Sequence, residues 1–238
     1  MIRMPADRTV GGPAARHGRR WWPLLAALGL ALLWCLGLLV VRWRLTNHLR
    51  YTFLMWNLFL AAVPLGLAFG LSCVRQRLIG VGLLTGWLLF LPNAPYVFTD
   101  FIHLSPYGRA PMWFDVLLLA SFALTALWLG LVSLHLVHEW VEQHFSPLAG
   151  WGVVLLACPL SGFGVYLGRF GRWNSWDVLH RPVALLADVV AQLSTPADAL
   201  RIGAVTFGFG GLLVVAYLIW WAQGAWQRRP VPSAPPSQ

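Results

Sequence analysis

The stretch WPLLAALGLALLWCLGLLVV, residues 22–41, runs for twenty residues without a charged side chain. A bilayer core about 30 Å thick needs roughly 20 apolar residues of helix to cross it. The run is longer than the apolar part of a typical cleavable export signal, about 7–15 residues. No clear small-residue cleavage site ends it. This stretch therefore predicts an uncleaved first membrane span.

Five further apolar runs of similar length follow this first one along the chain. Their central parts lack charged side chains, because a charge at mid-bilayer costs about 2.5–3.5 kcal/mol on insertion scales. The runs cover residues 51–74, 78–101, 113–137, 147–167 and 202–222. Together the six runs predict an all-α, polytopic transmembrane helical bundle.

The composition of the whole chain excludes a soluble globular protein. Of its 238 residues, 58% are apolar and 11% are charged, against about 25% charged residues in soluble domains. Basic residues outnumber acidic ones by 17 to 8, and every basic residue is Arg. These Arg residues are scattered among the apolar runs and form no single basic face. We therefore expect membrane lipids as partners and no nucleic acid, and protein partners stay open.

Two polar tails frame the predicted transmembrane domain, which covers residues 21–227. Residues 1–20 are rich in Arg, and residues 228–238 are rich in Pro and Ser. Both tails are predicted to be disordered, because neither holds enough apolar residues to form a packed core.

Two segments depart from the pattern of simple spans. In the third run, Pro92-Asn93-Ala94-Pro95 places two prolines three residues apart, which removes two amide donors and disturbs a helix. Either the span ends early and residues 96–104 follow the interface, or the span is kinked. Between the fifth and sixth runs, apolar side chains recur at helical spacing at Leu179, Val183, Leu186, Val190 and Leu193. This spacing predicts one amphipathic helix lying in the membrane interface.

Most polar residues that could take part in binding or catalysis fall on one side of a six-span bundle. This side holds the connections between spans 1 and 2, 3 and 4, and 5 and 6. The candidate ligand-binding residues on this side are Asn57, Asn93, Asp100, His103, Asp115, Arg169, Arg172, Asn174, Trp176 and Asp177. The first span usually sets orientation, so the N-terminus is predicted to be cytoplasmic and this polar side to face outward.

Three of these residues are candidate metal ligands. Asp100 and His103 are three residues apart and share a face if helical, and Asp115 follows at the start of the next run. Carboxylates with one imidazole suit a divalent cation such as Zn²⁺ or Mn²⁺. The alternative is a hydrogen-bonded network between the third and fourth spans, with Arg169 or Arg172 pairing an aspartate. No cofactor follows from the residues beyond this candidate metal.

Arg169 and Arg172 also suggest a site for a phosphate. They are three residues apart, each after a glycine, and planar guanidinium groups bind phosphate through paired hydrogen bonds. Trp173 and Trp176 lie close by in the sequence, at the expected depth of lipid headgroups, where they could line a lipid or sugar site. The alternative is a structural loop whose Arg side chains touch headgroups without a specific ligand.

Several motifs resemble a known family. They are MWNLFLA at residues 55–61, WLLFLPNAPY at 87–96, WFD at 113–115, YLGRF at 166–170 and RWNSWD at 172–177. Together they resemble an uncharacterised bacterial family of integral membrane proteins, domain of unknown function 1361, over about residues 46–221. The resemblance implies a multi-spanning protein of a bacterial inner (plasma) membrane, and it brings no assigned activity, cofactor or catalytic residue.

Three functions remain open at this point. The first is the binding of a lipid or lipid-linked phosphate at the polar side, with or without chemistry upon it. The second is a transporter or channel that uses broken spans 3 and 5, although no span centre holds the charge that ion pathways usually need. The third is a non-catalytic membrane scaffold.

Overall fold

The computed structural model describes residues 13–74, 76–105 and 109–227. Within these ranges all regular structure is helical, which confirms the predicted all-α fold. The elements are α1 (Pro13–Thr46), α2 (Phe53–Cys73), α3 (Arg77–Phe90), α4 (Asn93–Tyr96), the 3-10 helix η1 (Val97–His103), α5 (Met112–His144), α6 (Pro147–Arg169), α7 (Asp177–His180), α8 (Pro182–Leu193) and α9 (Pro196–Gln227).

Within the described ranges, six helical segments are long and apolar enough to cross a membrane, and each corresponds to one predicted run. They are Trp22–Thr46, Phe53–Cys73, Arg77–His103, Met112–His144, Pro147–Arg169 and Pro196–Gly224. The chain is therefore a multi-pass membrane protein. α5 is its central helix, because 67% of its most apolar window is buried, against 17% in the first span.

The first helix begins earlier than the sequence suggested. α1 starts at Pro13, so residues 13–20 of the predicted N-terminal tail are helical. Proline is well suited to a first helical turn, and the following Ala14 and Ala15 are strong helix formers. The rest of that predicted tail, residues 1–12, and the predicted C-terminal tail, residues 228–238, lie outside the described residues.

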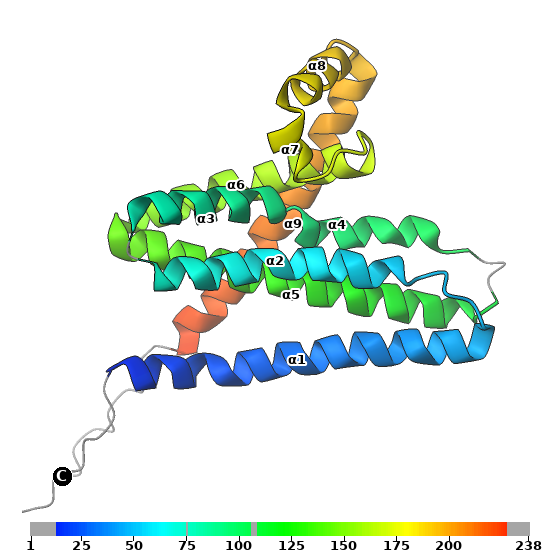
Figure 1. The fold of residues 1–238 in the computed structure, drawn as a ribbon, viewed down its shortest axis with the longest axis horizontal. Coiled ribbons are helices and arrows are strands. Elements are labelled where there is room, and N and C mark those ends of the chain that lie inside the picture. The colour runs from blue at the N-terminus through cyan, green and yellow to red at the C-terminus, as the bar shows by residue number, and fades with distance from the viewer. Residues whose placement is uncertain (1–12, 75, 106–108, 228–238) are drawn as a thin grey trace, which may run out of the picture.

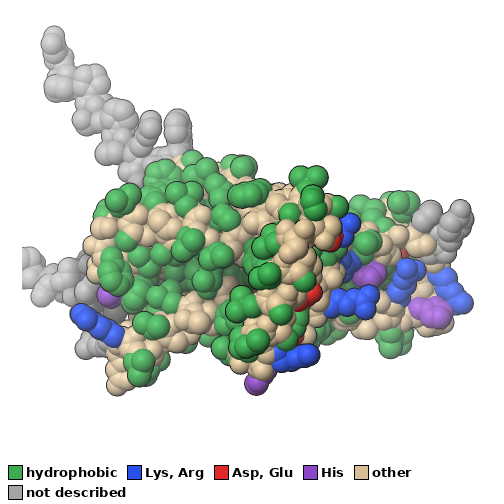
Figure 2. Space-filling model, turned by 90° about the horizontal axis from the view of Figure 1, so that it is seen from above, with side chains coloured by type: hydrophobic (Ala, Val, Ile, Leu, Met, Phe, Trp, Pro, Cys, Tyr) green, Lys and Arg blue, Asp and Glu red, His purple; other side chains and the backbone are tan. Residues whose placement is uncertain are grey.

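The spans alternate in direction, and α1, α2 and α5 run side by side (Figure 1). The end of α1, the start of α2 and the start of α5 lie together at one end of the bundle, while α7 and α8 stand beside the start of α9. Figure 2 shows a face that is largely apolar, with most of the visible Arg and His side chains toward that same end. This distribution matches a bundle whose apolar flank faces lipid.

The third span is interrupted but continues across the bundle. Leu91 and Pro92 keep helical dihedral angles between α3 and α4, and η1 then carries the chain to His103. Of the two predicted alternatives, the structure adopts the kinked span. Small residues on its neighbours make room for it. A Cβ atom at Gly164 of α6 would lie 2.4 Å from Cγ of Pro92, and one at Gly130 of α5 would lie 2.5 Å from Cβ of Ala94.

The predicted break in the fifth span is wrong. α6 is a single helix from Pro147 to Arg169, with Pro159 inside it. One proline removes only one helical hydrogen bond, and neighbouring helices in a membrane protein tolerate such a site. α9 packs closely at this point, since a Cβ atom at Gly210 would lie 2.9 Å from Cα of Pro159.

Candidate functional site

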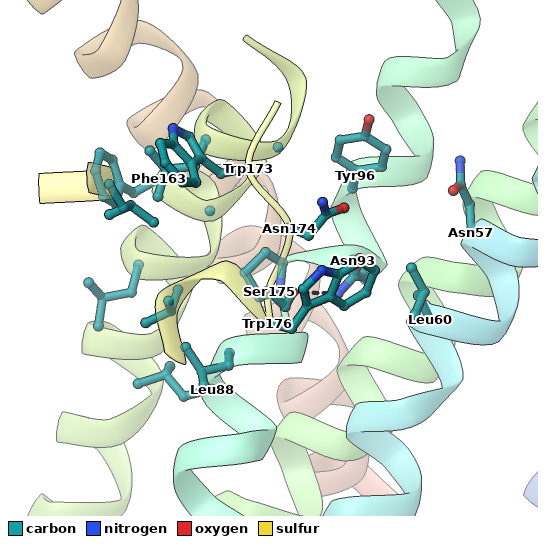
Figure 3. A pocket seen from close by; sticks show the side chains of 18 of the residues that line it. Asn57, Leu60, Leu88, Asn93, Tyr96, Phe163, Trp173, Asn174, Ser175 and Trp176 are labelled. Carbon is teal, nitrogen blue, oxygen red and sulfur yellow. Dashed lines mark hydrogen bonds between the residues drawn. The ribbon is translucent and has the colours of Figure 1, made fainter. Parts of the chain in front are cut away.

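A pocket of about 320 Å³ lies between α2, the α3–α4 junction, α6 and the segment that precedes α7 (Figure 3). Leucines form much of its wall, and four aromatic side chains besides Tyr96 line it: Trp56, Phe163, Trp173 and Trp176. Its polar lining is made by Asn57, Asn93, Tyr96, Asn174 and Ser175. None of the described residues that line this pocket is charged.

Four of the ten predicted site residues therefore come together here: Asn57, Asn93, Asn174 and Trp176. They come from three segments that lie far apart in the sequence. Figure 3 shows the segment carrying Asn174, Ser175 and Trp176 folded back against Asn93 of α4.

Asn93 joins the kinked span to this returning segment. Its carboxamide nitrogen donates to the carbonyl of Phe90 at 2.9 Å and to the hydroxyl of Ser175 at 3.4 Å. The first bond satisfies a carbonyl near the end of α3, where the helical ladder is interrupted. The second bond links α4 to the segment that precedes α7, and both of these line the pocket.

The returning segment is shaped by its own hydrogen bonds. The backbone N–H of Asn174 donates to Oδ2 of Asp177 at 2.7 Å, and its carboxamide nitrogen donates to the same oxygen at 3.2 Å. Arg172 just before it has φ of 56°, in the left-handed region that non-glycine residues rarely adopt. Asp177 thus positions Asn174 and is not itself part of the pocket wall.

Asn57 is hydrogen-bonded to a buried carboxylate that does not line the pocket, that of Asp100. Its carboxamide nitrogen donates to Oδ2 of Asp100 at 2.8 Å, and Asp100 is only 1% exposed. Nη1 of Arg169 lies 3.7 Å from Oδ1 of Asp100, while Nη2 of Arg169 donates to the carbonyl of Thr99 at 3.0 Å. The Arg169 charge therefore balances that of Asp100, and the pair sets the orientation of Asn57.

The predicted pairing of Arg169 with Arg172 around a phosphate does not form. α6 ends at Arg169, so the spacing of three residues is not a helical one. Arg169 turns toward Asp100 and Thr99, whereas the Arg172 side chain is exposed. Neither guanidinium group lines the pocket.

The three predicted metal ligands are also kept apart by other partners. Both carboxylate oxygens of Asp115 accept from Arg42, at 2.7 and 3.2 Å, while Asp100 accepts from Asn57. The His103 ring packs edge-on against Phe53, with ring centroids 5.0 Å apart. Among the described residues, no three His, Cys, Asp or Glu side chains are placed to hold a metal ion. The sequence could not show that Arg42 of α1 faces Asp115.

The α8 helix and the residue that precedes the returning segment contribute to the pocket as well. Leu185 of α8 lines it, and Trp173 donates its indole N–H to Oδ2 of Asp188 at 2.7 Å. Hydrogen bonds from Trp173 and Gln192 stabilise the ionised carboxylate and hold the pKa of Asp188 below its usual value. This bond ties α8 to the returning segment.

The sequence analysis missed several pocket residues, among them Trp56, Tyr96 and Ser175. Each lies next to, or within three residues of, a predicted site residue in the same motif. The whole motif, and not only its polar residues, could have indicated these pocket residues. The backbone that carries one polar side chain into the pocket carries its neighbours there too.

Comparison with known proteins assigns the chain to a family. Residues 56–215 match the family described as "Protein of unknown function (DUF1361)". No curated protein and no solved structure matches the chain. The matched segment contains every residue that lines the pocket, from Trp56 to Leu185. This protein is thus a multi-pass membrane member of the DUF1361 family.

Proposed function

We propose that this protein binds a membrane lipid, with the lipid headgroup in the pocket and its acyl chains against the leucine-rich wall. The observation that carries the proposal is the composition of one pocket on a membrane-spanning bundle. Carboxamides and indoles lie beside leucines, as small-molecule sites combine apolar walls with a few placed polar groups. A volume of about 320 Å³ accommodates a headgroup and not a whole lipid.

The α8 helix supports this proposal. Its apolar side chains point outward, with Val183 at 79% and Leu179, just before it, at 70% exposure. An exposed apolar row on a short amphipathic helix is favourable when it lies in the headgroup region of a bilayer. Leu185 on the same helix lines the pocket. An α8 helix that lies among lipid headgroups would therefore place the pocket next to the lipids that could enter it.

We further propose that the membrane is a bacterial inner membrane, that the N-terminus is cytoplasmic, and that the pocket lies on the outward side. The support is the orienting effect of the first span. Lipids of the outer leaflet would then supply the ligand.

The test is native mass spectrometry of the protein purified in a mild detergent, followed by identification of any lipid that stays bound. Leu160→Trp and Leu88→Trp fill the pocket from two different walls, because both leucines line it. Leu156→Trp is the matched control, since Leu156 lies one turn before Leu160 and is exposed away from the pocket. We expect a discrete lipid on the wild type and the control, and its loss from both pocket variants.

Equal lipid retention in all four proteins would contradict the proposal, because the lipid would then be held elsewhere. Absence of any discrete lipid on the wild type, after reconstitution with total membrane lipid, would contradict it as well.

A further inference from the structure

We infer that the headgroup bound in this pocket is uncharged and rich in hydroxyl groups, of the polyol or sugar type. The inference rests on the proposed lipid-binding function and names the chemical class of the ligand. Three features of the lining carry it: the free atoms of the carboxamides, the indole surfaces and the position of the charges.

The first feature is that the pocket offers hydrogen-bond acceptors. Each carboxamide nitrogen already donates: that of Asn57 to Asp100, that of Asn93 to Phe90 and Ser175, and that of Asn174 to Asp177. These partners are acceptors, so they determine which end of each carboxamide is the nitrogen.

The carboxamide oxygens remain for a ligand. Within the described residues no donor is bonded to the oxygens of these three side chains. Figure 3 shows the oxygens of Asn57 and Asn174 turned toward the space between the two side chains. A ligand that satisfies these oxygens must bring O–H or N–H donors.

The second feature is a set of flat apolar surfaces. Trp173 and Trp176 flank the polar lining, and the indole N–H of Trp173 is held by Asp188 at 2.7 Å, which sets the position of its ring. The electron-rich face of an indole attracts the polarised C–H bonds of a sugar or polyol. A ring with hydroxyl groups at its edge and C–H bonds on its face uses both kinds of lining at once.

The third feature is that, among the described residues, no cationic side chain lines the pocket. A phosphate diester has only acceptor oxygens, so it would leave the three carboxamide oxygens without a donor. Burying an anion without a paired charge is costly. Arg169, which lies behind Asn57, is already balanced by Asp100 at 3.7 Å and bonded to Thr99. A neutral headgroup avoids this cost.

The experiment compares three lipids with identical oleoyl chains on the purified protein by native mass spectrometry. The probes are monoglucosyl dioleoylglycerol, dioleoyl phosphatidylglycerol and dioleoylglycerol without a headgroup. We expect the glucolipid to bind at least tenfold more tightly than either of the other two.

Two variants localise the effect. Ser175→Ala removes a hydroxyl from the pocket lining, whereas Ser194→Ala removes one from the exposed end of α8, outside the pocket. One hydrogen bond contributes about 1 kcal/mol, or roughly a fivefold change in affinity. We expect Ser175→Ala to weaken glucolipid binding about fivefold, and Ser194→Ala to leave it unchanged. Leu160→Trp should abolish binding of the glucolipid.

The outcomes separate the two proposals. Tighter binding of phosphatidylglycerol than of glucolipid, lost in Leu160→Trp, would overturn the uncharged headgroup and leave lipid binding intact. Equal binding of all three lipids that Leu160→Trp does not alter would overturn both. Glucolipid preference that survives in Ser175→Ala at full strength would also overturn the inference, because the polar lining that contains Ser175 would not be what recognises the sugar.

Discussion

A buried ion pair, Arg42 with Asp115, is one of the side-chain links between the first span and the central one. Each is only 2% exposed, and the guanidinium donates to both carboxylate oxygens, at 2.7 and 3.2 Å. The Arg42 guanidinium also lies 4.2 Å from the centre of the Tyr51 ring. Burial and the nearby Asp115 charge raise the pKa of the Tyr51 phenol, so it stays neutral beside the pair. The sequence identified Asp115 as a candidate site residue at the start of a span, but not its partner, which lies 73 residues earlier.

Removing the charge of one partner of this pair should destabilise the bundle more than replacing both partners by apolar side chains. We expect Asp115→Asn to lower the free energy of unfolding by about 3–5 kcal/mol, because a buried guanidinium loses its counter-charge. The double variant Arg42→Met/Asp115→Leu replaces the pair by apolar side chains of similar size, and we expect it to recover most of the loss. Denaturant unfolding in mixed micelles measures both. Equal destabilisation by the single and double variants would show that the Arg42 charge is not the cause.

At the scale of elements, the interrupted third span packs between α5 and α6, and each of these helices has a glycine at the point of contact. Gly164 faces Pro92, and Gly130 faces Ala94. A Cβ atom on either glycine would lie within 2.5 Å of a side-chain carbon of the residue it faces. The kink is therefore as much a property of α5 and α6 as of the two prolines. It turns Asn93 toward Ser175 and so forms one side of the pocket.

Adding one methyl group at Gly164 tests this arrangement. We expect Gly164→Ala to destabilise the protein by about 1–3 kcal/mol, the usual cost of overpacking, and to weaken lipid retention as Pro92 is displaced. Gly152→Ala on the same helix is the control, because nothing lies within 4 Å of its Cβ position. Thermal unfolding in detergent measures the difference. A Gly164→Ala protein as stable as the control would mean that α4 shifts without cost.

The bond between Trp173 and Asp188 makes the docking of α8 sensitive to acid. The pKa of Asp188 is lowered in the folded protein, so the tether contributes fully above the ordinary Asp value, about 3.9, and is lost as pH falls through the lower folded value. We expect Trp173→Phe to raise this pKa toward the ordinary value. Carboxyl ¹³C NMR titration of Asp-labelled protein follows it, with Trp176→Phe as the control. An unchanged pKa in Trp173→Phe would assign the shift to Gln192 alone.

The sequence predicted the spans well because apolar length is a local property that one run of residues displays by itself. The amphipathic pattern likewise predicted α8 from Val183 to Leu193, but Leu179 of the same pattern lies in the separate short helix α7, so the predicted single helix is two. The pocket could be predicted only as a set of motifs. Its geometry depends on how Ser175 meets Asn93 and how Asn57 meets Asp100, and these contacts join segments separated by 82 and 43 residues. No spacing rule within one segment reveals such a contact.

For the whole molecule, the six spans place their connections alternately on two sides, so one labelling experiment tests the proposed orientation. Cys73 is exposed at the end of α2, on the side of the N-terminus, while Cys35 and Cys158 are buried and serve as internal controls. Arg109 is exposed on the opposite side, just before α5. With a membrane-impermeant maleimide on intact cells, we expect Arg109→Cys in a Cys73→Ser background to react. Wild-type Cys73 should react only after permeabilisation, and the reverse pattern would invert the topology.

The partnership of α1 with α5 also has a consequence for biosynthesis. Of the other elements, α1 packs extensively only against α5, and α2 and α3 are made between them. At about 5–20 residues per second, the 73 residues between Arg42 and Asp115 take about 4–15 s to synthesise. During that interval the first helix has no docking surface, and Arg42, near its end, reaches headgroup water by extending its side chain. We therefore expect the first span to wait in lipid until α5 has been made, whereas α2 can pack against α3 before then.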